Sequence, residues 1–262
     1  MSEELEMDDG APRVTHQGAS KVPEVTLGFW IIKIAATTLG ETGGDWGTMS
    51  LNLGYLLGSI IFIGLFVGLV AAEIRAKTFH PALYWATIIA TTILGTTMAD
   101  FADRSLGVGY PGGVMIVLTL LIASLVLWHW VEGTVSVQSI TTPRAEWFYW
   151  CTILFSQTLG TALGDWTADS AGLGYLGAAA IFSALLLIIL LLHFFSSMSK
   201  TALFWSAFVL TRPLGAVVGD FLDKPVAQGG LELSRYVATG VLFVAIVILV
   251  LLLPQKAARS AH

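Results

Sequence analysis

The sequence has few charged residues and a single cysteine. Only 12% of its 262 residues are charged and 55% are hydrophobic, whereas a typical soluble domain is about 25% charged. One cysteine excludes an intramolecular disulfide and a thiolate metal cage. Lys and Arg number 13 against 18 Asp and Glu, and the lack of a basic excess argues against nucleic acid as a partner. An ordinary water-soluble enzyme is excluded by this composition.

Catalytic motifs are also missing. The sequence has no HExxH and no GxSxG motif, and no histidine lies deep within an apolar run. A zinc hydrolase or a serine hydrolase of these common types is therefore not indicated. We expect that the chain is not an enzyme and that it holds no cofactor other than a bound metal cation.

What the sequence does contain is eight apolar runs of about the 20 residues that a transmembrane helix needs. They cover roughly residues 25–46, 51–73, 81–101, 110–131, 146–166, 172–195, 201–221 and 231–254. The pattern predicts an all-α integral membrane protein with eight transmembrane helices in one domain, residues 25–254. The acidic residues 1–24 are expected to form a disordered, solvated tail, and residues 255–262 a short C-terminal tail.

The runs contain four copies of one motif. Its order is an aromatic residue, Trp, eight residues, Leu-Gly, three residues, a small residue, Asp and a second aromatic residue. The glycines of the four copies are Gly40, Gly95, Gly160 and Gly215, and the aspartates are Asp45, Asp100, Asp165 and Asp220. The repeats extend over about residues 25–80, 81–135, 146–200 and 201–254. Each holds two spans, so all four keep one orientation, which predicts four parallel tandem helical hairpins around a pseudo-fourfold axis along the membrane normal.

On this motif the sequence resembles the bacterial membrane proteins of unknown function that are built from four tandem repeats, each with two transmembrane stretches and a characteristic tryptophan. The resemblance covers about residues 25–254. It implies a topology and a bacterial cytoplasmic membrane, but no activity. Two departures bear on fourfold equivalence: Pro213 interrupts the fourth motif, and Gly230 stands where the other repeats have Tyr55, Tyr110 and Tyr175.

A polar stripe leads back from each aspartate in steps of four residues, which stay near one helix face. Its oxygen-bearing members are the candidate residues of a cation pathway or binding site: Asp45, Asp100, Asp165, Asp220, Glu41, Thr37, Thr92, Thr96, Gln157 and Thr161. Two cations, Lys33 and Arg212, stand on the stripes against five carboxylates. The stripes should face protein or water, because a charge in hydrocarbon costs about 2.5–3.5 kcal/mol. The four aspartates are hard oxygen ligands, the type that Mg, Ca or Mn ions prefer.

The sequence therefore predicts a transporter or channel for a small cation, a hard divalent metal ion similar to Mn or a proton-coupled ion, whose partners are the lipid bilayer and that cation. Lys33 and Arg212 are expected to be charge partners of the carboxylates across helices, either as structural ion pairs or as tethered cations that leave when substrate arrives. The oligomeric state stays open.

Each of these features also has a purely structural explanation that requires no ligand. The Trp of the motif and the aromatic residue after its Asp, sixteen residues apart, fit belts at the two membrane interfaces. The aspartates fit caps of the turn that follows, and the pairs Gly54/Gly58 and Gly64/Gly68 predict close helix contact. The alternative function is a membrane-embedded regulator or scaffold without transport activity.

Basic residues set the expected orientation. Eight of them lie at or near one set of span ends and only Arg104, Lys224 and Arg235 at the other, which predicts that both termini are cytoplasmic.

A cysteine introduced at position 261 in a Cys151→Ala background tests this orientation. A membrane-impermeant maleimide should label it in inverted vesicles and leave it unlabelled in intact cells. Labelling in intact cells would place the C-terminus and the lysine-rich span ends outside.

Overall fold

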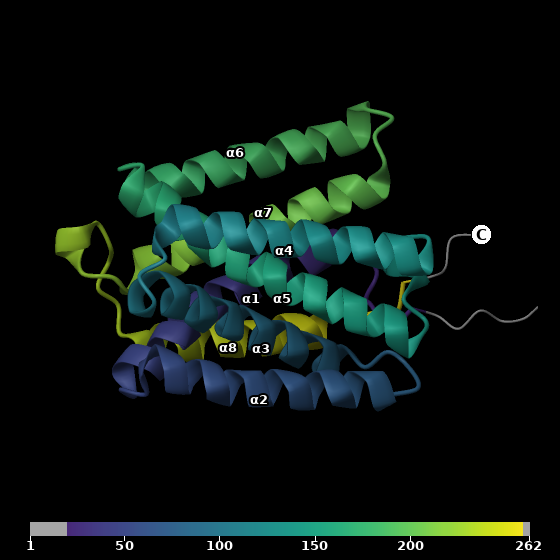
Figure 1. Cartoon of the computed structure of the whole chain (residues 1–262), viewed down its shortest axis with the longest axis horizontal. Coiled ribbons are helices and arrows are strands. Elements are labelled where there is room, and N and C mark those ends of the chain that lie inside the picture. The colour runs from purple at the N-terminus through teal and green to yellow at the C-terminus, as the bar shows by residue number, and fades with distance from the viewer. Residues whose placement is uncertain (1–19, 259–262) are drawn as a thin grey trace, which may run out of the picture.

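The computed structural model describes residues 20–258, which form eight α-helices (Figure 1). The helices are α1 Leu27–Asp45, α2 Gly54–Arg75, α3 Pro81–Asp100, α4 Gly109–Glu132, α5 Pro143–Asp165, α6 Gly174–Phe195, α7 Lys200–Asp223 and α8 Arg235–Leu252. Each corresponds to one predicted run. Six of them, all but α1 and α5, are long and apolar enough to cross a membrane.

Local sequence signals begin the odd-numbered helices. The side chains of Thr26, Thr142 and Ser199 accept a hydrogen bond from the first turn of α1, α5 and α7, which satisfies an otherwise free backbone N–H group. Pro81 and Pro143 occupy the first turn of α3 and α5, where a missing N–H group costs nothing.

The same turn follows the aspartate in three repeats. After α1, α3 and α5 the backbone continues as one π-helical turn, Trp46–Ser50, Phe101–Ser105 and Trp166–Ser170. The next helix then starts at Gly54, Gly109 or Gly174, each with φ between 64° and 72°, a conformation that a side chain disfavours. The fourth repeat differs, because α7 runs on to Asp223 and Gly230 lies against the backbone of Lys224, with no room even for a Cβ.

The odd-numbered helices form a closed inner ring. Helix α1 packs against α3, α3 against α5, α5 against α7, and α7 against α1. The motif glycine of each helix faces the polar stripe of the next one, so a Cβ on Gly40, Gly95, Gly160 or Gly215 would lie 2.2–2.8 Å from Thr92, Gln157, Arg212 or Thr37 respectively. The same contact therefore recurs at all four interfaces, in one register. This is the packing role that the repeated glycine indicates.

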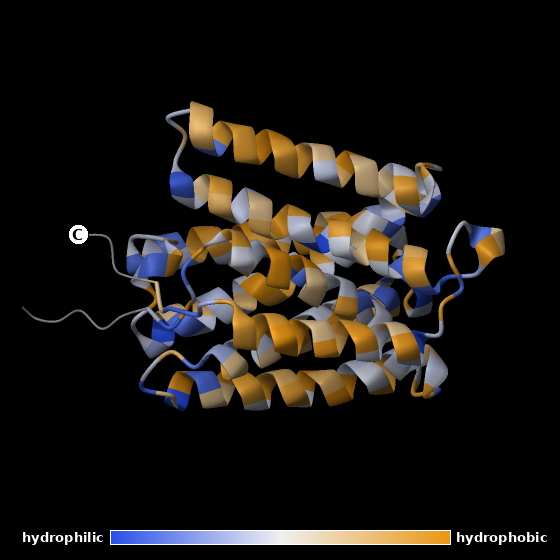
Figure 2. Ribbon diagram, turned by 180° about the vertical axis from the view of Figure 1, so that it is seen from behind, coloured by the Kyte–Doolittle hydropathy of each residue, from blue (hydrophilic) through white to orange (hydrophobic). Residues whose placement is uncertain are grey.

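The even-numbered helices form an outer layer that is shifted by one repeat. Helix α2 packs against α3, α4 against α5, α6 against α7, and α8 against α1. The two helices of one repeat follow each other in the chain, but each outer helix packs mainly against the inner helix of the next repeat. In this respect the structure differs from the expected arrangement, in which the two helices of a repeat pack as a hairpin. The outer helices bury only 11–22% of their apolar windows, whereas α3 and α7 bury 67%. Figure 2 shows them as hydrophobic along most of their length.

The outer position of α2 corrects one expectation about glycine. A Cβ on Gly64 or Gly68 would meet nothing within 4 Å, and only Gly58 is close to another element, at Thr48. The glycine pairs of this helix do not mark a helix–helix contact within the described chain.

The expectation of an interfacial belt is wrong for Trp85, Trp150 and Trp205, which are buried in the ring, whereas Trp30 is partly exposed. The aromatic residue before each Trp contacts the Trp of the following repeat. The ring centroids lie 5.5 Å apart for Phe29 and Trp85, 5.7 Å for Tyr84 and Trp150, 6.3 Å for Tyr149 and Trp205, and 5.9 Å for Phe204 and Trp30. These eight side chains form a circle of contacts, called the aromatic ring below, at the N-terminal ends of the four inner helices.

Both described ends of the chain lie beside this aromatic ring. Residues 20–24 pair with residues 256–258 through backbone hydrogen bonds and an antiparallel bridge between Pro23 and Ala257. Ser20 and Val22 are buried. The last five residues of the predicted tail are therefore packed, and residues 1–19 and 259–262 lie outside the described part.

The glycine register can be tested with a matched pair of substitutions. Gly95→Ala places a Cβ 2.9 Å from backbone atoms of α5, which cannot yield as a side chain can. It should destabilise the protein by about 1–3 kcal/mol. Gly64→Ala, on the open face of α2, should leave the melting temperature unchanged or raise it, because Ala is the better helix former. Equal thermal melts of the two variants in detergent would contradict the register.

Candidate cation site

The four polar stripes meet inside the inner ring. Every stripe position is at most 4% exposed. The stripes form four layers, which are Lys33, Ile88, Ile153 and Phe208; Thr37, Thr92, Gln157 and Arg212; Glu41, Thr96, Thr161 and Ala216; and Asp45, Asp100, Asp165 and Asp220. All predicted site residues therefore lie inside the ring, although their contacts there differ.

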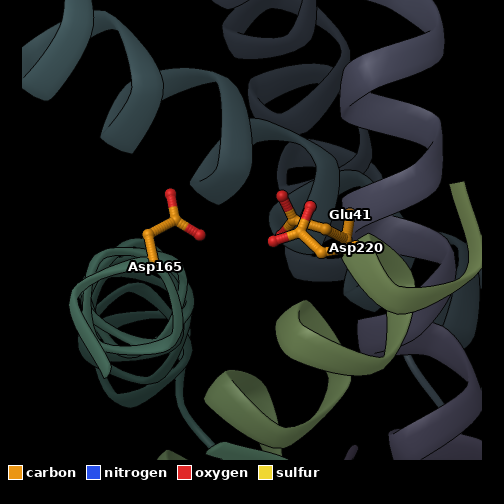
Figure 3. A group of neighbouring side chains, drawn as sticks. All are labelled: Glu41, Asp165 and Asp220. Atoms are coloured by element: carbon orange, nitrogen blue, oxygen red, sulfur yellow. The ribbon is translucent and has the colours of Figure 1, made fainter. Parts of the chain in front are cut away.

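Three carboxylates form the candidate cation site. Oxygen atoms of Glu41, Asp165 and Asp220 lie within 4.8 Å of one another. Figure 3 shows the Asp165 carboxylate facing the other two from the opposite side of the gap between the helices. An ion with ligands at about 2.0–2.6 Å spans such a separation. The donor set, three buried carboxylates and no nitrogen or sulfur atom, suits a hard cation.

Asp45 and Asp100 lie outside this group. Asp45 forms a second cluster with Asp220 and Asp223, whereas Asp100 is bound by Arg104 at 2.8 Å. Of the four predicted aspartates, Asp165 and Asp220 belong to the first group, a triad that also includes the glutamate one turn deeper in the stripe of α1.

Arg212 connects the four inner helices. From α7 its Nη2 donates to Glu41 Oε2 of α1 at 3.0 Å, and to the hydroxyl oxygens of Thr96 on α3 and Thr161 on α5, each at 2.6 Å. The ion pair crosses between helices as expected and does not reach Asp220 on the same helix. Removing Glu41 from this fully buried cation would leave its charge uncompensated.

Lys33 has no such partner. It is fully buried, its Nζ lies 4.1 Å from the centre of the Phe208 ring, and no described residue accepts a hydrogen bond from it. Its pairing with a carboxylate is not observed. The side-chain amide of Gln157 is likewise buried without a partner among the described residues.

The threonine hydroxyls have acceptors both in their own helix and in the next one. Thr37 and Thr92 donate to backbone oxygens three residues earlier at 2.8 Å and lie 3.2 Å from a backbone oxygen of the neighbouring helix. Thr96 lies 3.1 Å from the backbone oxygen of Gly40 across the α1–α3 interface. Their oxygens keep free lone pairs, but their hydroxyl hydrogens are engaged in structural contacts.

Three basic residues complete the aspartate layer. Their positions at span ends in the sequence indicate loop charges, so their contacts with the aspartates were not predicted. Arg104 lies between Asp100 and Asp165, Lys224 pairs with Asp45 and with Asp220 at 3.1 Å, and Arg235 lies 3.0 Å from Asp223. The excess of negative charge expected from the stripes is largely neutralised. The spacing Asp100/Arg104 and Asp220/Lys224, four residues in each case, is the signal that could have revealed two of these pairs.

Lys224 is the most enclosed of the three. Burial alone would lower its pKa, but Asp220, Asp45 and Asp223 together raise the pKa well above its usual value. The ammonium group therefore stays charged at neutral pH and acts as a fixed counter-ion.

A cavity of about 750 Å³ opens beside this layer. Its lining includes Asp220 of the triad, Arg104, Lys224 and Arg235 around it, and Tyr175 of the Gly-Tyr turn. Of the three triad residues, the cavity lining includes Asp220 and neither Glu41 nor Asp165.

Variants that restore the repeat pattern test the buried pair. Glu41→Gln should cost about 3–5 kcal/mol, the usual loss when one partner of a buried ion pair is removed. The double variant Glu41→Thr/Arg212→Thr places at both positions the residues that the second repeat has at Thr96 and Thr92, and it should recover much of the loss. A double variant less stable than Glu41→Gln in thermal melts would show that the pair is not the reason for the loss.

Comparison with known proteins gives a family but no activity. No curated protein and no solved structure matches the chain. A family model described as Repeat of Unknown Function (DUF347) matches four times, at residues 28–79, 83–134, 148–199 and 203–254. These matches coincide with the four predicted repeats and cover most of the chain. The chain therefore belongs to the DUF347 repeat family.

Proposed function

We propose that the chain is an integral membrane protein with eight spans that carries a small cation, a hard divalent ion or a proton-coupled ion, through its inner ring. The observation that carries this proposal is the buried triad of Glu41, Asp165 and Asp220. Three carboxylates at this separation repel one another in a poorly hydrated interior. A bound cation or bound protons would relieve that repulsion.

The outer layer supports the membrane location. Helices α2, α4, α6 and α8 expose rows of Leu, Ile, Val and Phe, far more than a soluble monomer exposes in one patch. In lipid these rows cost nothing, and the less apolar α1 and α5 are shielded by their neighbours. The bilayer is the partner that this surface fits, and a bacterial cytoplasmic membrane is the compartment that the family resemblance favours.

The arrangement of charge supports cytoplasmic termini. The three basic residues of the opposite end, Arg104, Lys224 and Arg235, are paired with carboxylates of the aspartate layer. They do not act as free loop charges, which strengthens the basic bias of the other end. Residues 20–24 and 256–258 both lie at that end.

A carrier fits the ring better than an open channel. The aromatic ring and the layer of Ile88, Ile153 and Phe208 occlude the axis on one side of the polar layers. Arg212 binds the same Glu41 that belongs to the triad, so an arriving cation would compete with a tethered one. Such competition couples binding to a rearrangement of α7 against α1, which is what a carrier needs.

A scaffold without transport activity is the second candidate. The ion pairs of Asp45, Asp100 and Asp220 favour it, because a carboxylate already neutralised by a fixed cation contributes structure without a ligand.

Asp165→Asn tests the transport proposal. Asn keeps the volume and one oxygen but removes a charge of the triad, so Mn²⁺ binding should weaken at least tenfold and flux into proteoliposomes should cease. Asp165 is better suited than Asp100 because, among residues 20–258, its one ion pair is with Arg104 at 3.7 Å, whereas Asp100 is held by the same Arg104 at 2.8 Å.

The matched control is Asp169→Asn, four residues further along and exposed at the cavity. It should leave binding and flux close to the wild-type values. Wild-type protein whose melting temperature and flux respond to none of Mn²⁺, Mg²⁺, Ca²⁺, Zn²⁺ and pH would overturn the proposal and favour the scaffold.

A further inference from the structure

Two buried glutamates lie at the opposite end of the inner ring and have no part in the proposed carboxylate site. Glu73 belongs to the end of α2 and Glu146 to the first turn of α5, and each is only 1% exposed. Ile74, the residue after Glu73, packs against the buried cluster that contains Tyr84 and Tyr149, whose hydroxyls hydrogen-bond to each other at 2.6 Å within the aromatic ring. The glutamates therefore lie directly beside the aromatic closure.

The ammonium group of Lys21 is held between them by three oxygen atoms. Its Nζ lies 2.6 Å from Glu146 Oε1 and donates to the backbone oxygens of Glu73 at 3.1 Å and Ile74 at 3.3 Å. Those two oxygens belong to the last turn of α2, where the helix dipole is negative, and the oxygen of Glu73 also accepts from the backbone N–H of Ala76 at 3.2 Å. Carboxylate and carbonyl oxygens are also the usual ligands of hard metal cations.

The charge of this cluster is not balanced. Among residues 20–258, the ion pair with Lys21 is the only one that Glu146 forms, and Glu73 forms none, so two buried carboxylates have the single positive charge of Lys21 beside them. Glu73 Oε1 and Glu146 Oε2 have no hydrogen-bond partner among the described residues. Buried polar groups are normally paired, and these two oxygens indicate that the site can accept more positive charge than Lys21 supplies.

Lys21 reaches the site from residues 20–24, which lie outside the eight helices. Ser20 donates to the backbone oxygen of Val137 at 2.7 Å, and residues 22–24 pair with residues 256–258. Val22 packs into the main buried cluster, so Lys21 is held in place at the glutamates.

We propose that Glu73, Glu146 and the terminal carbonyls of α2 form a second cation site, a divalent one, and that Lys21 is its built-in occupant. A divalent cation balances the two carboxylates, which one ammonium group does not. The assignment of this site to the inner end of the transport pathway rests on the proposed function, whereas the binding itself does not.

The test counts Mn²⁺ bound to the full chain in detergent, from the loss of the electron paramagnetic resonance signal of the free ion. Lys21→Met should bind one Mn²⁺ more than the wild type. Lys77→Met, which removes an exposed lysine between α2 and α3, should bind the same number as the wild type. Adding Glu146→Gln to Lys21→Met should abolish the gain. Equal binding by the wild type and Lys21→Met would overturn the proposal.

Two further arms keep the result interpretable. In an Asp165→Asn background the gain caused by Lys21→Met should persist, so failure of the triad and failure of this site give different results. If Lys21→Met lowers the melting temperature, MnCl₂ should restore it by several degrees, whereas the conservative Lys21→Arg should show neither the loss nor the gain in binding. A Lys21→Met protein that Mn²⁺ does not stabilise would mark Lys21 as a purely structural ion pair.

Discussion

The close approach of the inner helices at their glycines is the constraint on which the rest of the structure depends. Because a Cβ at Gly40, Gly95, Gly160 or Gly215 would overlap the stripe of the next helix, the four axes can come together only at these positions. Because the helices lie so close, the polar stripes are enclosed, and their side chains form hydrogen bonds and ion pairs within the ring instead of with water. The close approach also leaves the even-numbered helices with a single role, which is to cover the ring and present an apolar surface outward.

The repeated motif made the eight helices and the interior stripes predictable, since a period of four and a fixed offset from Gly to Asp need no tertiary information. The pairing of helices was not predictable. Whether α2 packs on α1 or on α3 depends on the geometry of the turn after Asp45, and the motif is the same in either case. The burial of the Tyr84 and Trp85 rings was missed for a related reason, because an aromatic residue at a span end fits an interfacial belt and an inner ring equally well.

Departures from fourfold symmetry place the additional charged side chains of the interior on two of the four inner helices. The stripes of α3 and α5 carry uncharged side chains before the aspartate, whereas Lys33, Glu41 and Arg212 add charges on α1 and α7. A symmetric ring would hold four equivalent carboxylates around its axis. The glutamate instead displaces the candidate site by one turn toward the interior, where the guanidinium group of Arg212 from the adjoining layer contacts it. Pro213 follows immediately, and its ring packs at the same Gly160 as Arg212 does.

Both ends of the ring combine buried acids with basic side chains from outside the inner helices. Arg104, Lys224 and Arg235 close on the aspartates at one end, and Lys21 closes on Glu73 and Glu146 at the other. A fixed cation that a mobile cation must displace allows exchange but opposes free flow, because the two positive charges cannot share one set of oxygens. The aromatic ring lies between the two acidic clusters. Under the proposed function, release of the basic side chains from the acids, first at one end and then at the other, is therefore the step that limits transport of the cation.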